Sequence, residues 1–128
     1  MDEREEHFRQ LRWSLQDLAA CNQHSLFPEW ATTADHLAIN FEQSSSAVLE
    51  RYGGELDATR RAVLDALSAL LTRMSRDHAE FDIDIWSMTA LATSDQWATV
   101  RRLAVEALTA FGWSEELPPA DRTPMYAR

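Results

Sequence analysis

An acidic segment late in the chain has the residue types that bind divalent cations. Asp82 and Asp84 are separated by one residue, and in an extended chain two such side chains point to the same side. Carboxylate oxygens are the ligands that Mg²⁺ and Ca²⁺ prefer in proteins. Glu80 and His78 are close enough in the sequence to complete a ligand set. One hypothesis is therefore a metal-dependent helical-bundle enzyme that uses this Asp-x-Asp segment.

The same segment also has the composition of a protein-docking surface. Carboxylates alternate there with apolar residues, and no arginine interrupts them. The residues concerned are Asp77, Glu80, Phe81, Asp82, Asp84 and Trp86. Acidic groups steer the encounter with a basic protein, and a buried aromatic side chain supplies much of the affinity. We therefore expect a basic partner protein here, the alternative being a solvated acidic loop whose aromatic residues enter the core.

Trp13 is a further candidate for a partner contact. At 100° per residue it lies about 200° around its helix from Leu11, and so it falls off the apolar stripe. Either a partner, a second copy of the chain or the C-terminal tail is expected to cover it.

The composition excludes several common kinds of enzyme. All 12 basic residues are arginine, so Schiff-base chemistry, a pyridoxal-phosphate anchor and a phosphate-loop lysine are excluded. The three glycines do not form a phosphate-binding loop. No histidine stands three residues after a glutamate, as di-iron bundles require. Cys21 is the only cysteine, which excludes an internal disulfide and fits a reducing, cytoplasmic setting.

The net charge of −9 argues against nucleic acid as a partner, because a nucleic-acid-binding surface must be basic. No apolar run approaches the roughly 18 residues of a membrane span. Arginine use without lysine, together with abundant alanine, is typical of a GC-rich bacterial genome.

Four stretches repeat apolar residues with the period of a helix. They run from Asp2 to about Cys21, from Pro28 to Gly53, from Asp57 to Met74 and from Thr93 to Gly112. Serines 44–46 compete with the helix for backbone hydrogen bonds, so a break in the second helix is an open alternative. Ser87 is placed to cap one short helical turn before the last helix.

Individual residues mark where these helices begin and end. Asp57 is a good N-cap, and Thr93 with Gln96 fits a capping box that opens the last helix. Gly112 is placed to end that helix in the left-handed conformation, with Trp113 folding back on its last turn.

Between the third and last helices the pattern changes to a period of two. The apolar residues Phe81, Ile83 and Ile85 alternate there with Glu80, Asp82 and Asp84. A lone strand would leave its backbone groups unpaired, so we expect an extended connector over about 78–86. A strand completed by a second copy is the alternative, and it would make the protein a structural homodimer.

The sequence therefore predicts an all-α, four-helix-bundle-like single domain over 1–113 and a loosely ordered, proline-containing tail over 114–128. In size, acidity and helical class it resembles bacterial immunity proteins, small inhibitors that neutralise basic nuclease toxins. No motif carries this resemblance, so it implies no role for any single residue. The expected function is that of a non-enzymatic, acidic protein-binding module without a cofactor.

Overall fold

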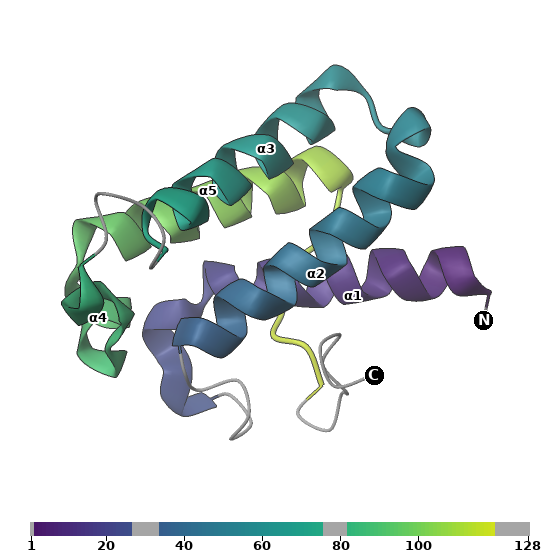
Figure 1. Cartoon of the computed structure of the whole chain (residues 1–128). Coiled ribbons are helices and arrows are strands. Elements are labelled where there is room, and N and C mark those ends of the chain that lie inside the picture. Colours follow the sequence, from purple (N-terminus) through teal and green to yellow (C-terminus); the bar gives the residue numbers. More distant parts are fainter. Residues whose placement is uncertain (1, 27–33, 76–81, 120–128) are drawn as a thin grey trace.

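The computed structural model describes residues 2–26, 34–75 and 82–119, which form five α-helices and no strand (Figure 1). The helices are α1 (Glu3–Ala19), α2 (Ala34–Tyr52), α3 (Ala58–Arg73), α4 (Met88–Thr93) and α5 (Asp95–Phe111). Short 3₁₀ helices are η1 (Cys21–Leu26), η3 (Gly53–Glu55) and η4 (Ile83–Trp86). Four long helices and one short one confirm the predicted all-α, bundle-like architecture.

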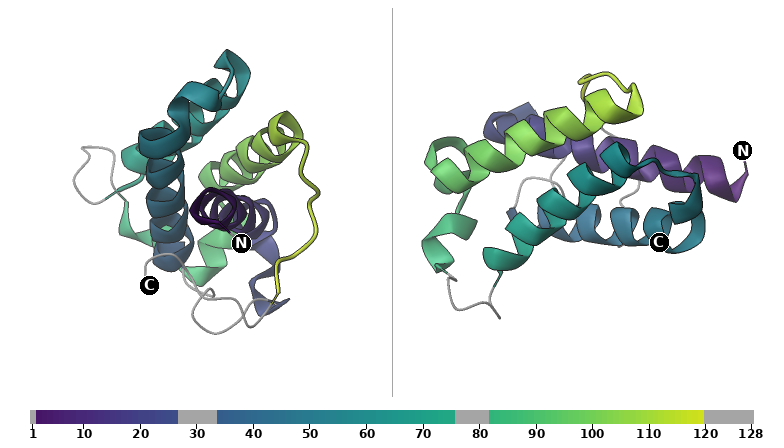
Figure 2. Two further views of the ribbon diagram at one scale, coloured as in Figure 1. Left: turned by 90° about the vertical axis from the view of Figure 1, so that its right-hand side faces the viewer. Right: turned by 90° about the horizontal axis from the view of Figure 1, so that it is seen from above.

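The four long helices do not pack equally against one another. Helix α1 packs against both α2 and α5, and α3 packs against α5. Figure 2 shows α1 lying between α2 and α5. Helices α2 and α3 are joined through η3 and diverge from it, so they make few contacts with each other (Figure 1). One face of the bundle is therefore open between α2 and α3.

The apolar stripes of the sequence form the core. Most of their members are buried, and residues at the margins such as Phe8 and Val63 are partly buried against them. The fully buried large side chains include Leu11, Leu15, Leu18, Leu37, Phe41, Leu64, Leu67, Trp97 and Leu108. No helix in the described part of the chain is long and apolar enough to cross a bilayer.

Most of the predicted helix ends are confirmed. The Asp57 carboxylate accepts the Arg60 N–H at 2.9 Å, and Gly112 has φ +73°. Trp113 donates its N–H to the Leu108 carbonyl at 2.9 Å and so folds back on α5 as expected. The residue that caps α5 was predicted wrongly: it is Ser94, whose hydroxyl accepts the Trp97 N–H at 3.1 Å.

The physical reason is that Thr93 still belongs to α4. Its hydroxyl donates to the Thr89 carbonyl at 2.9 Å, one turn back, and is not directed at α5. Ser87 caps α4 as predicted, because its hydroxyl accepts the Ala90 N–H at 3.1 Å.

The serines of α2 do not break the helix. Ser44 donates to the Asn40 carbonyl at 2.7 Å, and Ser45 donates to the Glu42 carbonyl at 3.3 Å. These hydroxyls bond to the preceding turn and leave the helical backbone intact. The predicted start of the helix at Pro28 lies outside the described residues.

The predicted extended connector is wrong for residues 83–86, which form η4, while residues 78–81 lie outside the described part. Asp82 is extended, but its carboxylate accepts the Asp84 N–H at 3.0 Å and its carbonyl accepts the Ile85 N–H at 3.1 Å. These two bonds close a turn, so, contrary to the prediction from the sequence, Asp82 and Asp84 do not point to the same side of an extended chain.

Residues 114–119 contain no helix or strand, and residues 120–128 of the predicted tail lie outside the described chain. The Gln16 side-chain amide donates to the Ser114 carbonyl at 2.9 Å. The start of the tail is therefore attached to α1.

Candidate functional site

A groove of about 670 Å³ lies at the open face of the bundle, between α2, the end of α3 and η4. Helix α2 provides one wall, and α3 with η4 provides the other. Its lining residues are Asp35, Ala38, Ile39, Glu42, Gln43, Leu71, Thr72, Ser75, Ile83, Asp84, Trp86 and Ser87. The groove exists because α2 and α3 diverge, so their facing sides are not fully buried against each other.

The groove exposes large apolar side chains. Ile39 is 43% exposed and Ile83 is 62% exposed, and both line it. Among the described residues only Leu117 is another exposed large apolar side chain. Since most large apolar residues of the described segments are buried, two exposed isoleucines lining one groove from distant parts of the chain are a distinctive feature of this surface.

Carboxylates border this apolar surface. Asp35 lies in the first turn of α2, Glu42 about two turns further, and Asp84 on η4. No arginine or histidine is among the lining residues that the structure describes. Glu42 also accepts a hydrogen bond from the Ser68 hydroxyl of α3 at 3.1 Å. The groove therefore combines an apolar surface with a negative border.

Several other polar groups of the groove already bond to the protein backbone. The Trp86 indole N–H donates to the Met74 carbonyl at 2.6 Å. The Ser75 hydroxyl donates to the Thr72 carbonyl at 2.7 Å, and the Ser87 hydroxyl donates to the Asp84 carbonyl at 2.9 Å. The indole N–H and these two hydroxyls are therefore already used in hydrogen bonds to the backbone.

The helix η4 is held in place by two tryptophans. Trp97, fully buried on α5, donates its indole N–H to the Ile85 carbonyl at 2.6 Å. Its ring meets that of Trp86 edge to face, with centroids 5.5 Å apart. These contacts fix the backbone of η4 and thereby the positions of Ile83 and Asp84.

The structure brings together only part of the predicted acidic site. Asp84 and Trp86 line the groove, whereas Asp82 is exposed beside it and accepts the Asp84 N–H. Asp77 and Glu80 lie outside the described residues.

The predicted metal site gains no support from geometry. Within residues 2–26, 34–75 and 82–119, no three His, Cys, Asp or Glu side chains are close enough to bind an ion together. His78 and Glu80, which that hypothesis needs, are not described.

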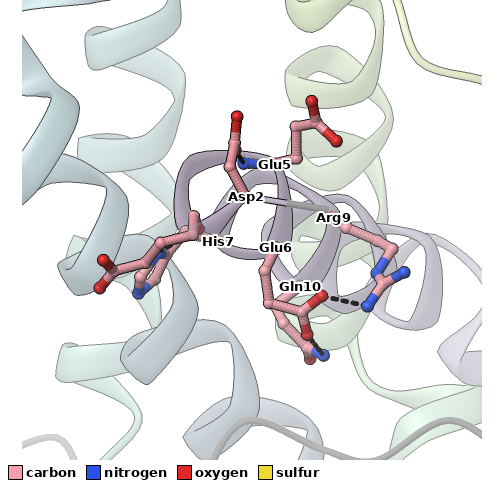
Figure 3. Close-up of polar contacts among 7 residues, drawn as sticks. Asp2, Glu5, Glu6, His7, Arg9 and Gln10 are labelled. Atoms are coloured by element: carbon pink, nitrogen blue, oxygen red, sulfur yellow. Dashed lines mark hydrogen bonds and ion pairs between the residues drawn. The ribbon is translucent and has the colours of Figure 1, made fainter.

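Trp13 belongs to a different surface. It is half-buried, and the Arg9 guanidinium lies over its ring, 4.9 Å from the ring centroid. Arg9 also pairs with Glu6 (Figure 3). A separate hollow of about 380 Å³ is bounded by Trp13, Trp113 and tail residues such as Leu117. The tail therefore lies beside Trp13. Of the three predicted neighbours of Trp13, which were a partner, a second copy and the tail, the structure shows the tail there.

Asp35, Ile39, Glu42 and Ile83 are groove residues that sequence reasoning missed. The sequence feature that could have indicated the α2 wall of the groove is Ile39. It lies about 200° around the helix from Leu37 and so off the apolar stripe. In the structure this off-stripe isoleucine is exposed and forms part of the groove surface.

Cys21 is the one cysteine of the sequence, and it lies in the core. It is buried, and burial raises the pKa of its thiol, an effect that outweighs the Arg101 guanidinium nitrogen 3.9 Å from the sulfur. A protonated, buried thiol is a poor nucleophile.

No family model matches the chain, and no curated protein or solved structure matches it either.

Proposed function

We propose that this protein is a non-enzymatic binding module that docks a basic partner protein in the groove between α2, α3 and η4, in the manner of an inhibitor or immunity protein. The observation that carries the proposal is the exposed Ile39–Ile83 surface bordered by Asp35 and Asp84. Exposed apolar surface with a polar border is typical of protein-binding sites. As part of the proposal, the single buried Cys21 fits a protein of the reducing cytoplasm.

Charge supports a basic partner over a second copy of this chain. The net charge is −9, and a second copy docked through the same groove would bring carboxylates against carboxylates. Like charges in contact disfavour association, whereas an acidic surface accelerates the encounter with a basic one. We therefore propose a basic partner protein for this face, and not a homodimer.

The test compares two charge reversals. The wild-type protein captures its partner from the source cells, mass spectrometry identifies it, and binding is then measured with purified proteins. The groove variant is Asp35→Arg with Asp84→Arg, and the control is Asp65→Arg on the exposed side of α3, outside the groove.

We expect the groove variant to bind at least tenfold more weakly and to lose affinity mainly through slower association at low salt. The control variant should bind like wild type, and circular dichroism should show all proteins folded. Equal affinity of the groove variant and wild type would refute the proposal.

A further inference from the structure

The walls of the groove restrict the backbone of whatever occupies it. Helices α2 and α3 use their backbone groups internally, and no strand edge exists in the described chain. An extended peptide would find no row of backbone partners there and would leave its own groups unpaired on burial. A helix satisfies its own backbone and needs only side-chain contacts from the walls.

The length of the α2 wall of the groove suits about two helical turns. Its α2 wall runs from Asp35 to Gln43, which at 1.5 Å per residue is about 12 Å. A helix of about eight residues covers the same length, with apolar side chains at i, i+3 or i+4, and i+7 facing one side. Those side chains would lie over Ile39 and Ile83.

The charges specify the flanks of that helix. Asp35 and Glu42 stand about two turns apart on one wall, and Asp84 stands on the other. Cationic side chains on either side of the apolar stripe would meet these carboxylates. Because the Trp86 N–H is already bonded to Met74, its ring is left to provide apolar and cation–π contacts.

We infer that the groove receives an amphipathic helix of the partner, about two to three turns long, with bulky apolar side chains facing Ile39, Ile83 and Trp86 and arginine or lysine facing Asp35 and Asp84. The inference rests on the proposed function and specifies the part of the partner that binds.

Isoleucine methyl groups are a suitable NMR probe of the groove, because the chain has three isoleucines, Ile39, Ile83 and Ile85. Ile39 and Ile83 line the groove, while Ile85 is packed against the core. Labelling the isoleucine δ1 methyl groups with ¹³C therefore gives two signals from the groove and one internal control.

The ligand probe is a 14-residue helical peptide with leucines at i, i+3 and i+7 and arginines flanking them. One matched peptide replaces arginine with glutamate, and another keeps the composition but has a central proline that breaks the helix. We expect the arginine peptide to shift the Ile39 and Ile83 signals saturably and the Ile85 signal much less. The other two peptides should bind at least tenfold more weakly.

Charge exchange makes the test specific. The Asp35→Arg, Asp84→Arg protein should lose the arginine peptide and bind the glutamate peptide, while Asp65→Arg should behave like wild type. No shift with the arginine peptide would overturn the inference, and so would equal binding of the helical and proline-containing peptides.

The result also separates the inference from the proposed function. If charge reversal abolishes partner binding but the arginine peptide fails, the groove is an interface for a surface of another shape and only the helix inference is wrong. If charge reversal leaves partner binding unchanged, the proposed function itself is wrong.

Discussion

Trp86 and Trp97 meet edge to face, with ring centroids 5.5 Å apart and ring planes at 89°. Each indole N–H also bonds to a backbone carbonyl, Trp86 to Met74 and Trp97 to Ile85. The pair thus links the end of α3, η4 and α5. The wall of the groove that carries Ile83 and Asp84 depends on this link.

Replacing Trp97, the buried tryptophan of the pair, should lower the free energy of unfolding more than replacing Trp86. Trp97→Phe removes a fully buried indole and leaves the Ile85 carbonyl without its donor, so we expect a loss of about 2–3 kcal/mol in the free energy of unfolding. Trp86→Phe, at a partly exposed ring, should lose about 1 kcal/mol. Urea denaturation measures both, and the reverse order would contradict this description of η4.

The contact of α1 with α2 depends on small hydroxyl side chains. The Ser44 hydroxyl lies 3.0 Å from that of Ser14, and both residues are buried. Ser44→Leu should therefore overpack the interface and cost about 1–3 kcal/mol. Ser46→Leu, two residues along and exposed, should stay within about 0.5 kcal/mol of wild type. Similar thermal unfolding of the two variants would count against this packing.

The left-handed residue that ends α5 should tolerate only glycine well. Gly112 has φ +73°, so Gly112→Ala should destabilise the protein by about 1–2 kcal/mol although nothing lies within 4 Å of the added carbon. Gly54→Ala also meets nothing within 4 Å, and its φ is not positive. Its effect should be close to zero or stabilising. Calorimetric melting of the two variants gives the comparison directly.

Stability should depend on pH through Cys21. Burial raises the pKa of this thiol, so the folded state keeps its proton at pH values where the unfolded chain loses it. This contribution is fully present below the ordinary thiol pKa of about 8.5 and is lost as pH rises through the folded value.

Wild type should therefore lose stability relative to Cys21→Ala above about pH 8.5, by at most about 1.4 kcal/mol per pH unit. Urea titrations at pH 7.5, 8.5 and 9.5 measure the difference. A constant difference would show that the thiol titrates alike in both states.

Much of the fold was predictable because helical periodicity and end signals are local. The stripe of Leu11, Leu15 and Leu18 is buried. Helix α3 begins at the N-cap Asp57 and α5 ends at Gly112, as these residue types require. The prediction of an extended connector failed because the three alternating residues Phe81, Ile83 and Ile85 are too few positions to distinguish a strand from a 3₁₀ turn. The turn depends instead on Asp82, whose carboxylate accepts the Asp84 N–H and so caps η4.

The groove was only partly predictable. Asp84 and Trp86 were proposed from local composition, but Asp35 and Ile39 are more than forty residues away from them in the chain. Their meeting depends on the angle between α2 and α3, which no local pattern encodes. An off-stripe isoleucine was the only sequence signal for the α2 wall.

Crosslinking from within the groove tests the central claim most directly. A photoreactive p-benzoyl-phenylalanine at Ile39 lies in the proposed interface, and the same group at the exposed Ala66 of α3 lies outside it. With the purified partner, we predict that the Ile39 position gives an adduct mapping to a basic, apolar-faced segment and that Ala66 gives none. Equal adducts from both positions, or an adduct from Ala66 alone, would contradict the assignment of the groove as the docking site.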